Sequence, residues 1–436
     1  MPAFIRSRLP SGRVGRAIVA MAAGSAGVQL IGLLASPVTA RVFSPAATGT
    51  GMVFAYLAAI LGEVASLRYD MAMPLPKERS DRLDVLLLCL FIQVPLFLIL
   101  TVAVLAGRGQ IAKWMGDPAV ADYLLLLPLG VLGYALVQML VQWRSRDRDF
   151  PRIVKARFHQ SAGQVGYQLS AGALTAGSPW MLVTGTILGN LLCAAGLLRE
   201  FSGEILRRWR AVPLSQLWAV ARQYRRFPLF NSWSVLANTF TSSIAVFALA
   251  ALYSSEETGY YRMAQVLIAV PVAAISTAIS SVYLSEAGRL VSEDPAALLR
   301  LYLKFTRRLA CFAALIILGS LALPFIVPVL FGSRWAETGH YAMIMAWPSA
   351  ATLVCVVANN IPLVGRNHWE SLWTVLRIVA MLAGIYVCRE TGLTARQTLA
   401  VISGILFACS GALIGLNVIA LKAHLKQKTR KAAIQP

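Results

Sequence analysis

Long apolar stretches separated by short polar segments recur along the whole chain. A helix needs about 20 mostly apolar residues to cross the roughly 30 Å hydrocarbon core of a bilayer. Twelve stretches have about that length, and no connection between them is long enough to hold a soluble domain. The pattern predicts an all-α polytopic membrane protein. The predicted spans are 17–40, 47–67, 83–106, 119–142, 159–176, 180–198, 228–253, 259–284, 309–331, 340–363, 371–388 and 398–421.

Composition and charge support this prediction. Of the 436 residues, 58% are hydrophobic and 14% are charged, whereas soluble domains are roughly 45–50% apolar and about 25% charged. A net charge of +21 in a soluble chain would indicate a nucleic-acid partner. Here Lys and Arg gather in alternate connections, as the positive-inside rule requires of cytoplasmic loops. We therefore expect no nucleic acid as partner, and we expect both chain termini to be cytoplasmic.

Two connections on the predicted outer face share a pattern at a spacing of 210 positions. Residues 43–50 read Phe-Ser-Pro-Ala-Ala-Thr-Gly-Thr, and residues 253–260 read Tyr-Ser-Ser-Glu-Glu-Thr-Gly-Tyr. A looser pair, Met-Gly-Asp at 115–117 and Phe-Gly-Ser at 331–333, precedes the fourth and tenth spans. Ser, Thr and Asp cap helices, and Gly adopts turn conformations. Both pairs indicate an internal repeat.

The repeat predicts how the chain divides. Six spans separate the two copies, so the copies share one orientation in the membrane. Parallel repeats of this kind build transporters from two lobes around a central cavity. We expect a six-helix lobe at 1–200, a basic cytoplasmic linker at 201–227, and a second six-helix lobe with a basic tail at 228–436.

Motifs for catalysis are missing from the sequence. It contains neither a Gly-rich phosphate loop ending in Lys-Ser/Thr nor a His-Glu-x-x-His metal site. Its short connections leave no room for a domain that binds a sugar donor. We expect a transporter without catalytic residues, metal or cofactor.

Ionisable residues inside or beside the spans are the candidate functional groups, because charge is costly there. Guanidinium groups bind phosphate bidentately and keep their charge when partly desolvated. The candidates for binding an anionic substrate are Arg41, Arg68, Arg262 and Arg377. The candidates for coupling to a H⁺ or Na⁺ gradient are Glu63 and Asp70.

A second interpretation stands beside several of these candidates. Arg68, Asp70 and Arg262 are also placed to extend to the membrane surface. Glu63 is also placed to be a structural partner of Arg68. Three glutamines, Gln160, Gln164 and Gln168, share one helix face. They line a cavity, which we favour, or they hydrogen-bond a neighbouring helix.

Three stretches carry a family resemblance. They are Thr-Gly-Tyr-Tyr at 258–261 followed by Pro271, Tyr283 and Ala287; the turn Phe-Gly-Ser-Arg-Trp-Ala-Glu-Thr-Gly at 331–339; and Leu-Arg-Tyr-Asp at 67–70 followed by Pro-Leu-Pro at 74–76. In order and spacing they resemble the polysaccharide (O-antigen, Wzx-type) flippases of the multidrug/oligosaccharidyl-lipid/polysaccharide exporter superfamily. That family often has Glu where Asp70 stands.

The resemblance implies a function in the bacterial inner membrane. It implies translocation of undecaprenyl-pyrophosphate-linked oligosaccharide from the cytoplasmic to the periplasmic leaflet by alternating access. A polysaccharide polymerase and a chain-length regulator are the partners it suggests, beside membrane lipids. Two alternatives stay open: a cation-coupled drug or small-molecule exporter of the same superfamily, and a non-transporting scaffold for polysaccharide assembly.

Overall fold

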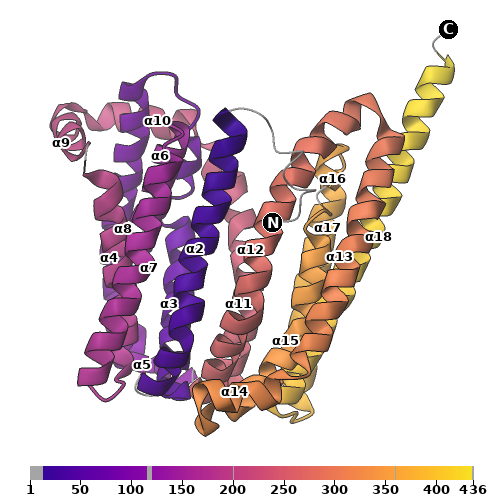
Figure 1. The fold of residues 1–436 in the computed structure, drawn as a ribbon. Helices are drawn as coiled ribbons and strands as arrows, with labels where there is room; N and C mark the ends of the chain where they lie inside the picture. The colour runs from indigo at the N-terminus through magenta and orange to yellow at the C-terminus, as the bar shows by residue number, and fades with distance from the viewer. Residues whose placement is uncertain (1–12, 115–119, 200, 359, 435–436) are drawn as a thin grey trace. The chain divides into compact units, whose positions relative to one another are not determined.

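The computed structural model describes residues 13–114, 120–199, 201–358 and 360–434 (Figure 1). Every regular element in these ranges is a helix. Twelve helices or helix pairs coincide with the twelve predicted spans. They are α2 (Arg13–Val42), α3 (Pro45–Val64), α4 (Arg79–Trp114), α6 (Leu127–Arg146), α7 (Phe150–Leu174), α8 (Pro179–Leu198), α11 (Ser232–Leu252), α12 (Ser255–Glu293), α13 (Pro295–Ser320) with α14 (Leu323–Phe331), α15 (Ala336–Cys355), α17 (Asn367–Glu390) and α18 (Ala395–Ile434).

Shorter elements connect these helices. Four are short α-helices: α5 (Val120–Leu124), α9 (Ser202–Ala211), α10 (Leu214–Gln223) and α16 (Asn360–Leu363). Three are single turns of other helix types: η1 (Tyr69–Ala72), η2 (Phe227–Asn231) and η3 (Ser333–Trp335).

Seven of the described helices are long and apolar enough to cross a membrane, or up to eight if α13 and α14 form one broken span. The angle between α13 and α14 is 61°, so the predicted span at 309–331 lies on a bent helix pair. Helix α13 is also longer than predicted and begins at Pro295. The other predicted spans lie on less apolar helices such as α7, which carries the three glutamines.

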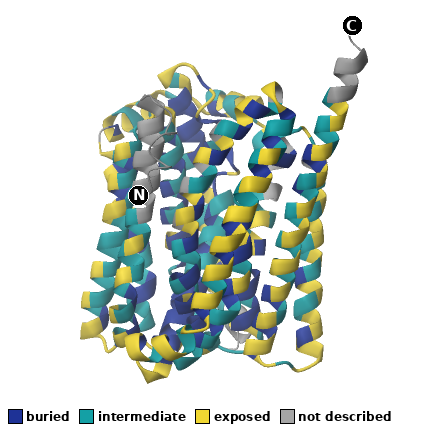
Figure 2. Ribbon diagram, turned by 45° about the vertical axis from the view of Figure 1, so that its right-hand side comes forward, coloured by how far each residue is buried: buried dark blue, intermediate teal, exposed yellow. Residues whose placement is uncertain are grey.

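Exposed residues line the outside of several helices (Figure 2), and many of them are large and apolar, as a lipid environment requires. Water would disfavour so large a contiguous apolar surface, whereas hydrocarbon accepts it. Helix α17 shows this most clearly, with its exposed residues Leu372, Val375, Leu376, Val379, Leu382, Tyr386 and Val387. The chain is thus built as a multi-pass membrane protein.

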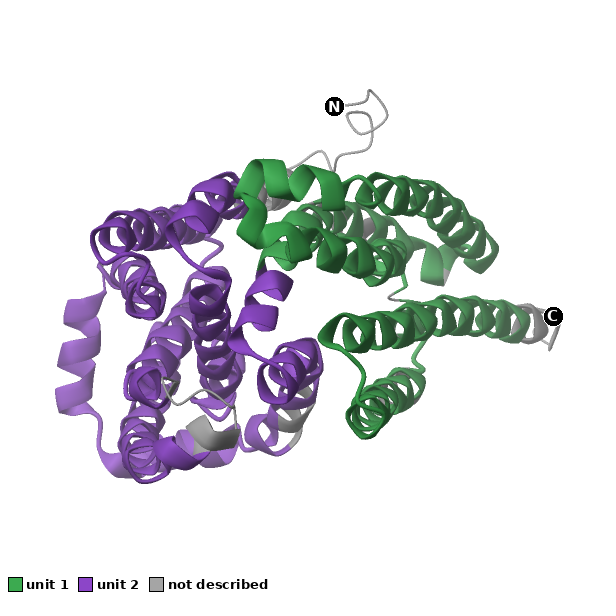
Figure 3. Ribbon diagram, turned by 90° about the horizontal axis from the view of Figure 1, so that it is seen from below, with its two compact units in different colours: residues 1–22, 263–436 green, residues 23–262 purple. Residues whose placement is uncertain are grey.

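The helices form two compact units (Figure 3). Unit 1 comprises residues 1–22 and 263–436, and unit 2 comprises residues 23–262. The division therefore falls inside α12. The boundary predicted at the 201–227 linker stays a prediction.

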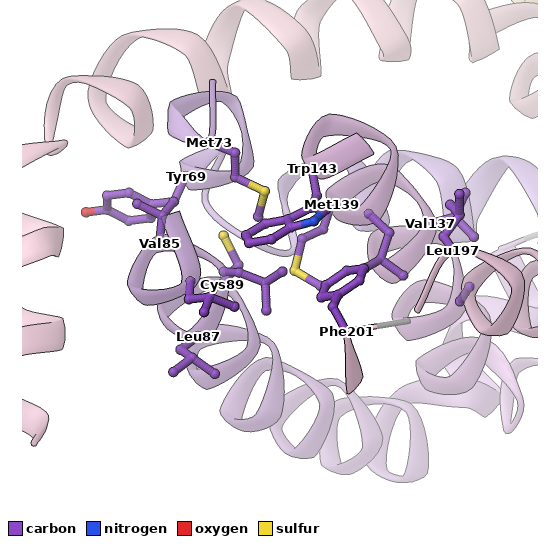
Figure 4. Packing of buried hydrophobic residues seen from close by; sticks show 14 of the residues in the cluster. Tyr69, Met73, Val85, Leu87, Cys89, Val137, Met139, Trp143, Leu197 and Phe201 are labelled. Carbon is purple, nitrogen blue, oxygen red and sulfur yellow. The ribbon is translucent and has the colours of Figure 1, made fainter. Parts of the chain in front are cut away.

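In unit 2 an aromatic core joins α4, α6 and α8 (Figure 4). Trp143 stacks on Phe201 with ring centroids 5.0 Å apart and planes inclined by 11°. The guanidinium carbon of Arg82 lies 4.1 Å from the centre of the Trp143 ring, in the geometry of a cation–π contact. This core fixes the ends of the helices from which the polar site is built.

In unit 1 a buried polar cluster joins α12, α16 and α18. The Tyr283 hydroxyl donates to Asn360 Oδ1 at 2.7 Å, and the Asn360 backbone N–H donates to Asn417 Oδ1 at 3.0 Å. Each polar group in this cluster thereby has a partner inside the apolar core, as burial requires.

The 210-residue repeat has the same hydrogen bonds in both copies. Ser44 Oγ accepts from the Ala47 N–H at 3.1 Å at the start of α3, and Ser254 Oγ accepts from the Glu257 N–H at 3.2 Å at the start of α12. The following threonine hydroxyl bonds back to the serine carbonyl at 3.0 Å in each copy. The predicted caps of this pair are confirmed. Of the looser pair, residues 115–117 lie outside the described residues.

The two Thr-Gly motifs also pack directly against each other. A Cβ on Gly49 would lie 1.7 Å from the Ser255 carbonyl oxygen, and a Cβ on Gly259 would lie 1.9 Å from the Pro45 carbonyl oxygen. No side chain fits at either position. The helix starts therefore cross in backbone contact, and only glycine permits this approach.

This crossing predicts that Gly259→Ala destabilises the protein. The added methyl group must push two backbones apart, which costs about 1–3 kcal/mol by analogy with overpacked cores. Gly288→Ala on the same helix is the matched control, because nothing lies within 4 Å of a Cβ there. We expect a lower thermal midpoint for Gly259→Ala in detergent and no loss for Gly288→Ala. Equal midpoints for the two variants would show that the crossing is not tight.

Candidate functional site

A left-handed turn after α3 begins the site. Leu67 and Arg68 have φ angles of 49° and 61°, a region that non-glycine residues adopt only at a cost. The turn ends the helix and directs the Arg68 side chain back toward Glu63 in the last turn of α3. A continuing α-helix would not place residues five apart on the same face.

The turn forms a charged triad. Arg68 Nη1 lies 2.6 Å from Glu63 Oε2 and 4.0 Å from Asp70 Oδ2. Asp70 Oδ1 also accepts from the Ser66 hydroxyl at 2.8 Å. Arg68 and Asp70 are buried, so the guanidinium stabilises both carboxylates in place of water, while the two carboxylates repel each other.

Asp70 lies in η1, outside the spans, and titrates differently from a free aspartate. Its burial raises the pKa of the carboxyl above the ordinary value, while the Arg68 guanidinium and the Ser66 hydroxyl oppose that rise. The roles of Glu63 and Asp70 in ion coupling stay a prediction. The alternative interpretation of Glu63, as the structural partner of Arg68, agrees with the ion pair.

The Glu63 carboxylate also receives hydrogen bonds from α6. The Tyr134 hydroxyl donates to Glu63 Oε1 at 2.9 Å, and Gln138 Nε2 donates to the same oxygen at 3.0 Å. One carboxylate therefore joins α3, the turn and α6.

Gln138 extends these bonds to α7. Its carbonyl oxygen accepts from Arg157 Nη2 at 3.2 Å, and Arg157 Nη1 donates to Gln160 Oε1 at 3.0 Å. Gln160 Nε2 in turn donates to Asn190 Oδ1 on α8 at 2.7 Å. We call the connected set from Asp70 to Asn190 the Glu63 network; its members are Glu63, Arg68, Asp70, Tyr134, Gln138, Arg157, Gln160 and Asn190.

Arg157 differs from Arg68 in the chemistry of its partners. Among the described residues its hydrogen-bond partners are two neutral amide oxygens, and no ion pair to it is recorded. An amide oxygen orients a guanidinium without neutralising its charge. Arg157 is therefore the group in the network best suited to attract an anion.

The glutamine stripe of α7 faces α8. Gln164 Nε2 donates to Thr186 Oγ1 at 3.3 Å, and Gln168 Nε2 donates to the Leu182 carbonyl at 2.9 Å. Gly185 and Gly189 form a Gly-x-x-x-Gly pattern on α8, and their missing side chains make room for Gln168 and Gln164. The stripe bonds a neighbouring helix, and binding of substrate by Gln160, Gln164 and Gln168 stays a prediction.

The remaining predicted residues lie outside the network. Arg41 and Arg262 are exposed on unit 2, at the end of α2 and near the start of α12. Arg377 belongs to unit 1, where its guanidinium carbon lies 4.5 Å from the centre of the Trp373 ring. Its Nε is buried and has no hydrogen-bond partner in the described parts of the chain.

Four network residues were not predicted from sequence: Tyr134, Gln138, Arg157 and Asn190. In the sequence Arg157 lies among the basic residues that precede the predicted span at 159–176. Its position three residues before Gln160 places it on the same helix face as the stripe, and this spacing is the signal that could have identified it.

The triad predicts a large loss of stability for Glu63→Ala. Removing the carboxylate takes away the closer partner of the buried Arg68 guanidinium and leaves only Asp70 at 4.0 Å; loss of one partner from a buried ion pair costs about 3–5 kcal/mol. The control is Glu337→Ala, which removes an exposed ion pair with Arg396 and should cost about 1 kcal/mol or less. Unfolding of the purified protein by SDS measures both. Similar losses for the two variants would contradict the structural role of the triad.

Known proteins share both the sequence family and the fold. A family profile described as polysaccharide biosynthesis protein matches residues 77–340. No curated protein sequence matches the chain. The fold is similar to an inward-facing multidrug resistance MATE family transporter of the MOP superfamily, with 14% identity and a TM-score of 0.56 over 93% of this chain and 95% of that one.

Two further solved structures agree with this fold. One is MATE in complex with MaL6, at 15% identity and a TM-score of 0.56 over 94% of this chain and 97% of that one. The other is the MATE transporter ClbM in complex with Rb⁺, at 15% identity and a TM-score of 0.50 over 95% and 99%. Because the family profile covers more than half of the sequence, and because these structures align along nearly all of it, the chain is a multi-pass membrane protein with the MATE fold and belongs to the polysaccharide biosynthesis protein family.

Proposed function

We propose that this chain is a flippase that moves a pyrophosphate-linked oligosaccharide lipid from the cytoplasmic to the periplasmic leaflet of the bacterial inner membrane. The observation that carries the proposal is the family match over residues 77–340, which includes the Glu63-binding helix α6 and all of α7 and α8. The expected lipid is undecaprenyl pyrophosphate, as the sequence resemblance implies.

The arginines within the helices supply the chemistry for the headgroup. Arg157 keeps an unneutralised charge between Gln138 and Gln160, and Arg377 rests on the face of Trp373 in unit 1. Guanidinium groups bind phosphate oxygens through two parallel hydrogen bonds. A pyrophosphate leaving the headgroup region needs such cations, because the bilayer interior does not solvate it.

The amides of the network suit the sugar. Gln and Asn side chains both donate and accept hydrogen bonds, so they can exchange their present partners for sugar hydroxyls. The lipid tail needs no binding site of that kind, because hydrocarbon surrounds the apolar faces of the helices. The polar headgroup therefore crosses inside the protein while the lipid tail stays in the bilayer. Alternating access of the protein moves the headgroup from one leaflet to the other.

A MATE-type drug exporter is the alternative that shares this fold. The two functions differ in the charge of the cargo. A flippase of this kind carries a dianionic pyrophosphate diester and needs cations, whereas a cationic drug needs carboxylates that are not neutralised. In the Glu63 network two carboxylates are matched by two guanidinium groups, Arg68 and Arg157, so no net negative charge is left for a cationic drug, which favours the flippase.

The proposal predicts that Arg157→Gln slows delivery of lipid-linked oligosaccharide to the periplasmic leaflet. A hydrogen bond to a charged group is worth about 1.5–3 kcal/mol, so we expect a loss of about 10-fold or more. The measurement is leaflet-resolved accumulation in a deletion strain complemented with each variant. Arg262→Ala and Arg377→Ala test two of the arginines predicted from sequence in the same strain.

The control is Arg146→Gln, which removes an exposed arginine at the end of α6. Wild type and this control should restore delivery, with cytoplasmic-side accumulation in the deletion strain. Normal periplasmic delivery in the deletion strain, with no second flippase present, would reject the proposal in favour of the exporter.

A further inference from the structure

Two short helices, α9 and α10, are fixed to the N-terminal end of α4 by polar contacts. Arg79 on α4 forms two hydrogen bonds with the Glu204 carboxylate, at 2.9 and 3.1 Å. Arg208 on α9 forms two with the buried Asp84 carboxylate, at 2.7 and 2.8 Å. Gln216 on α10 donates to the same carboxylate at 2.6 Å. Helix α9 and the start of α10 are therefore held in a defined position.

Helix α10 is fixed at its other end as well. The Tyr69 hydroxyl donates to the Ala221 carbonyl at 3.1 Å, and Leu217 packs into the aromatic core of unit 2.

Figure 1 draws α9 almost end-on while α4 and α8 run vertically, so the axis of α9 lies across the spans. That is the orientation of a helix parallel to the membrane surface.

Each helix keeps a second apolar face away from this core. Leu206 and Trp209 are three positions apart on α9 and are 55% and 45% exposed. Leu214 and Trp218 are four positions apart on α10 and are 66% and 73% exposed. The spacing places each pair on one side of its helix. Four large apolar groups thus lack cover within the described chain.

Basic side chains surround these apolar faces. Arg207, Arg210, Arg222, Arg225 and Arg226 are exposed, and no ion pair to any of them is recorded among the described residues. The arginines directed into unit 2, such as Arg208, are paired with carboxylates. The outward arginines are consequently available for anions outside the protein.

We propose that α9 and α10 form an interfacial anchor that binds anionic phospholipid at the surface of the membrane that the protein spans. The four apolar side chains enter the boundary between headgroups and acyl chains, where Trp is favoured. The arginines bind lipid phosphates, as basic amphipathic helices do at anionic surfaces. The side of the membrane is the cytoplasmic one, because basic connections concentrate there.

The membrane surface can cover the exposed apolar faces of α9 and α10 without any further protein partner. The helices lie across the spans at one of their ends, so the bilayer surface is the nearest apolar medium. The charge of the patch is positive, and the phospholipid headgroups that match it are negative. The anchor also contacts the site: Tyr69, which holds α10, stands between Arg68 and Asp70 in the sequence. The inference does not depend on what the protein transports.

The test measures how deep α10 lies in the membrane. Spin labels are attached to Trp218→Cys or Gln223→Cys in the full chain, in a background carrying Cys311→Ser to remove the exposed cysteine. Gln223 is the control because it is exposed on another side of α10. The protein is placed in nanodiscs of phosphatidylcholine with or without phosphatidylglycerol, and accessibility to O₂ and to a water-soluble nickel chelate is compared.

With phosphatidylglycerol present, the label at position 218 should favour O₂ several-fold over the nickel chelate, and the label at position 223 should show the reverse. Without the anionic lipid this preference at position 218 should weaken. Equal water exposure at both positions, or no response to phosphatidylglycerol, overturns the proposal.

A second measurement avoids labels at the tryptophan positions. Phosphatidylglycerol added to mixed micelles should raise the thermal midpoint of the wild-type protein. Arg222→Gln with Arg225→Gln should shift the half-saturating lipid concentration upward by about fivefold for each charge removed. Arg146→Gln, outside the anchor, is the control. An unchanged concentration in the double variant counts against anionic lipid as the occupant.

Discussion

The arrangement of unit 2 depends on the hydrogen bonds that one carboxylate, that of Glu63, accepts. Inside a bilayer a polar group has no water to bond, so each must find a partner in the protein. Glu63 accepts from Arg68, Tyr134 and Gln138, and these donors come from a strained turn and a neighbouring helix. Through Gln138 the same constraint reaches Arg157, Gln160 and Asn190. A single chain of hydrogen bonds between polar groups thus joins α6, α7 and α8.

One guanidinium in this chain of bonds has no ion-pair partner among the described residues, and that local difference connects structure with function. Arg68 pairs with Glu63 and Asp70, whereas Arg157 is held by amide oxygens alone. Both terminal nitrogens of Arg157 have a hydrogen-bond partner in the absence of ligand, yet its charge still attracts an anion. At the other end of α3, the crossing of Gly49 and Gly259 admits no side chain. Helix α3 is thus fixed by backbone contact at one end and by charge at the other.

Sequence predicted the parts of this structure that depend on local properties. Span positions follow from hydropathy, and the Ser44 and Ser254 caps follow from a motif that bonds within one helical turn. The partners of Glu63 could not be predicted, because Tyr134 lies 71 positions away and hydropathy does not say which helices are neighbours. Arg157 was not predicted because a charged residue near the end of a span resembles a loop residue. Its spacing of three positions from Gln160 nevertheless indicates that both lie on one helix face.

The central claim is that this protein moves a pyrophosphate-linked oligosaccharide lipid across a bilayer. The most direct test uses the purified chain in liposomes loaded with such a lipid in both leaflets, and an added glycosidase that reaches only the outer one. The account predicts that wild-type protein lets the enzyme consume nearly all of the lipid, while Arg157→Gln leaves the inner pool largely intact. If the inner pool is protected equally with wild-type protein and without protein, and the same liposomes export a cationic drug, the account is contradicted.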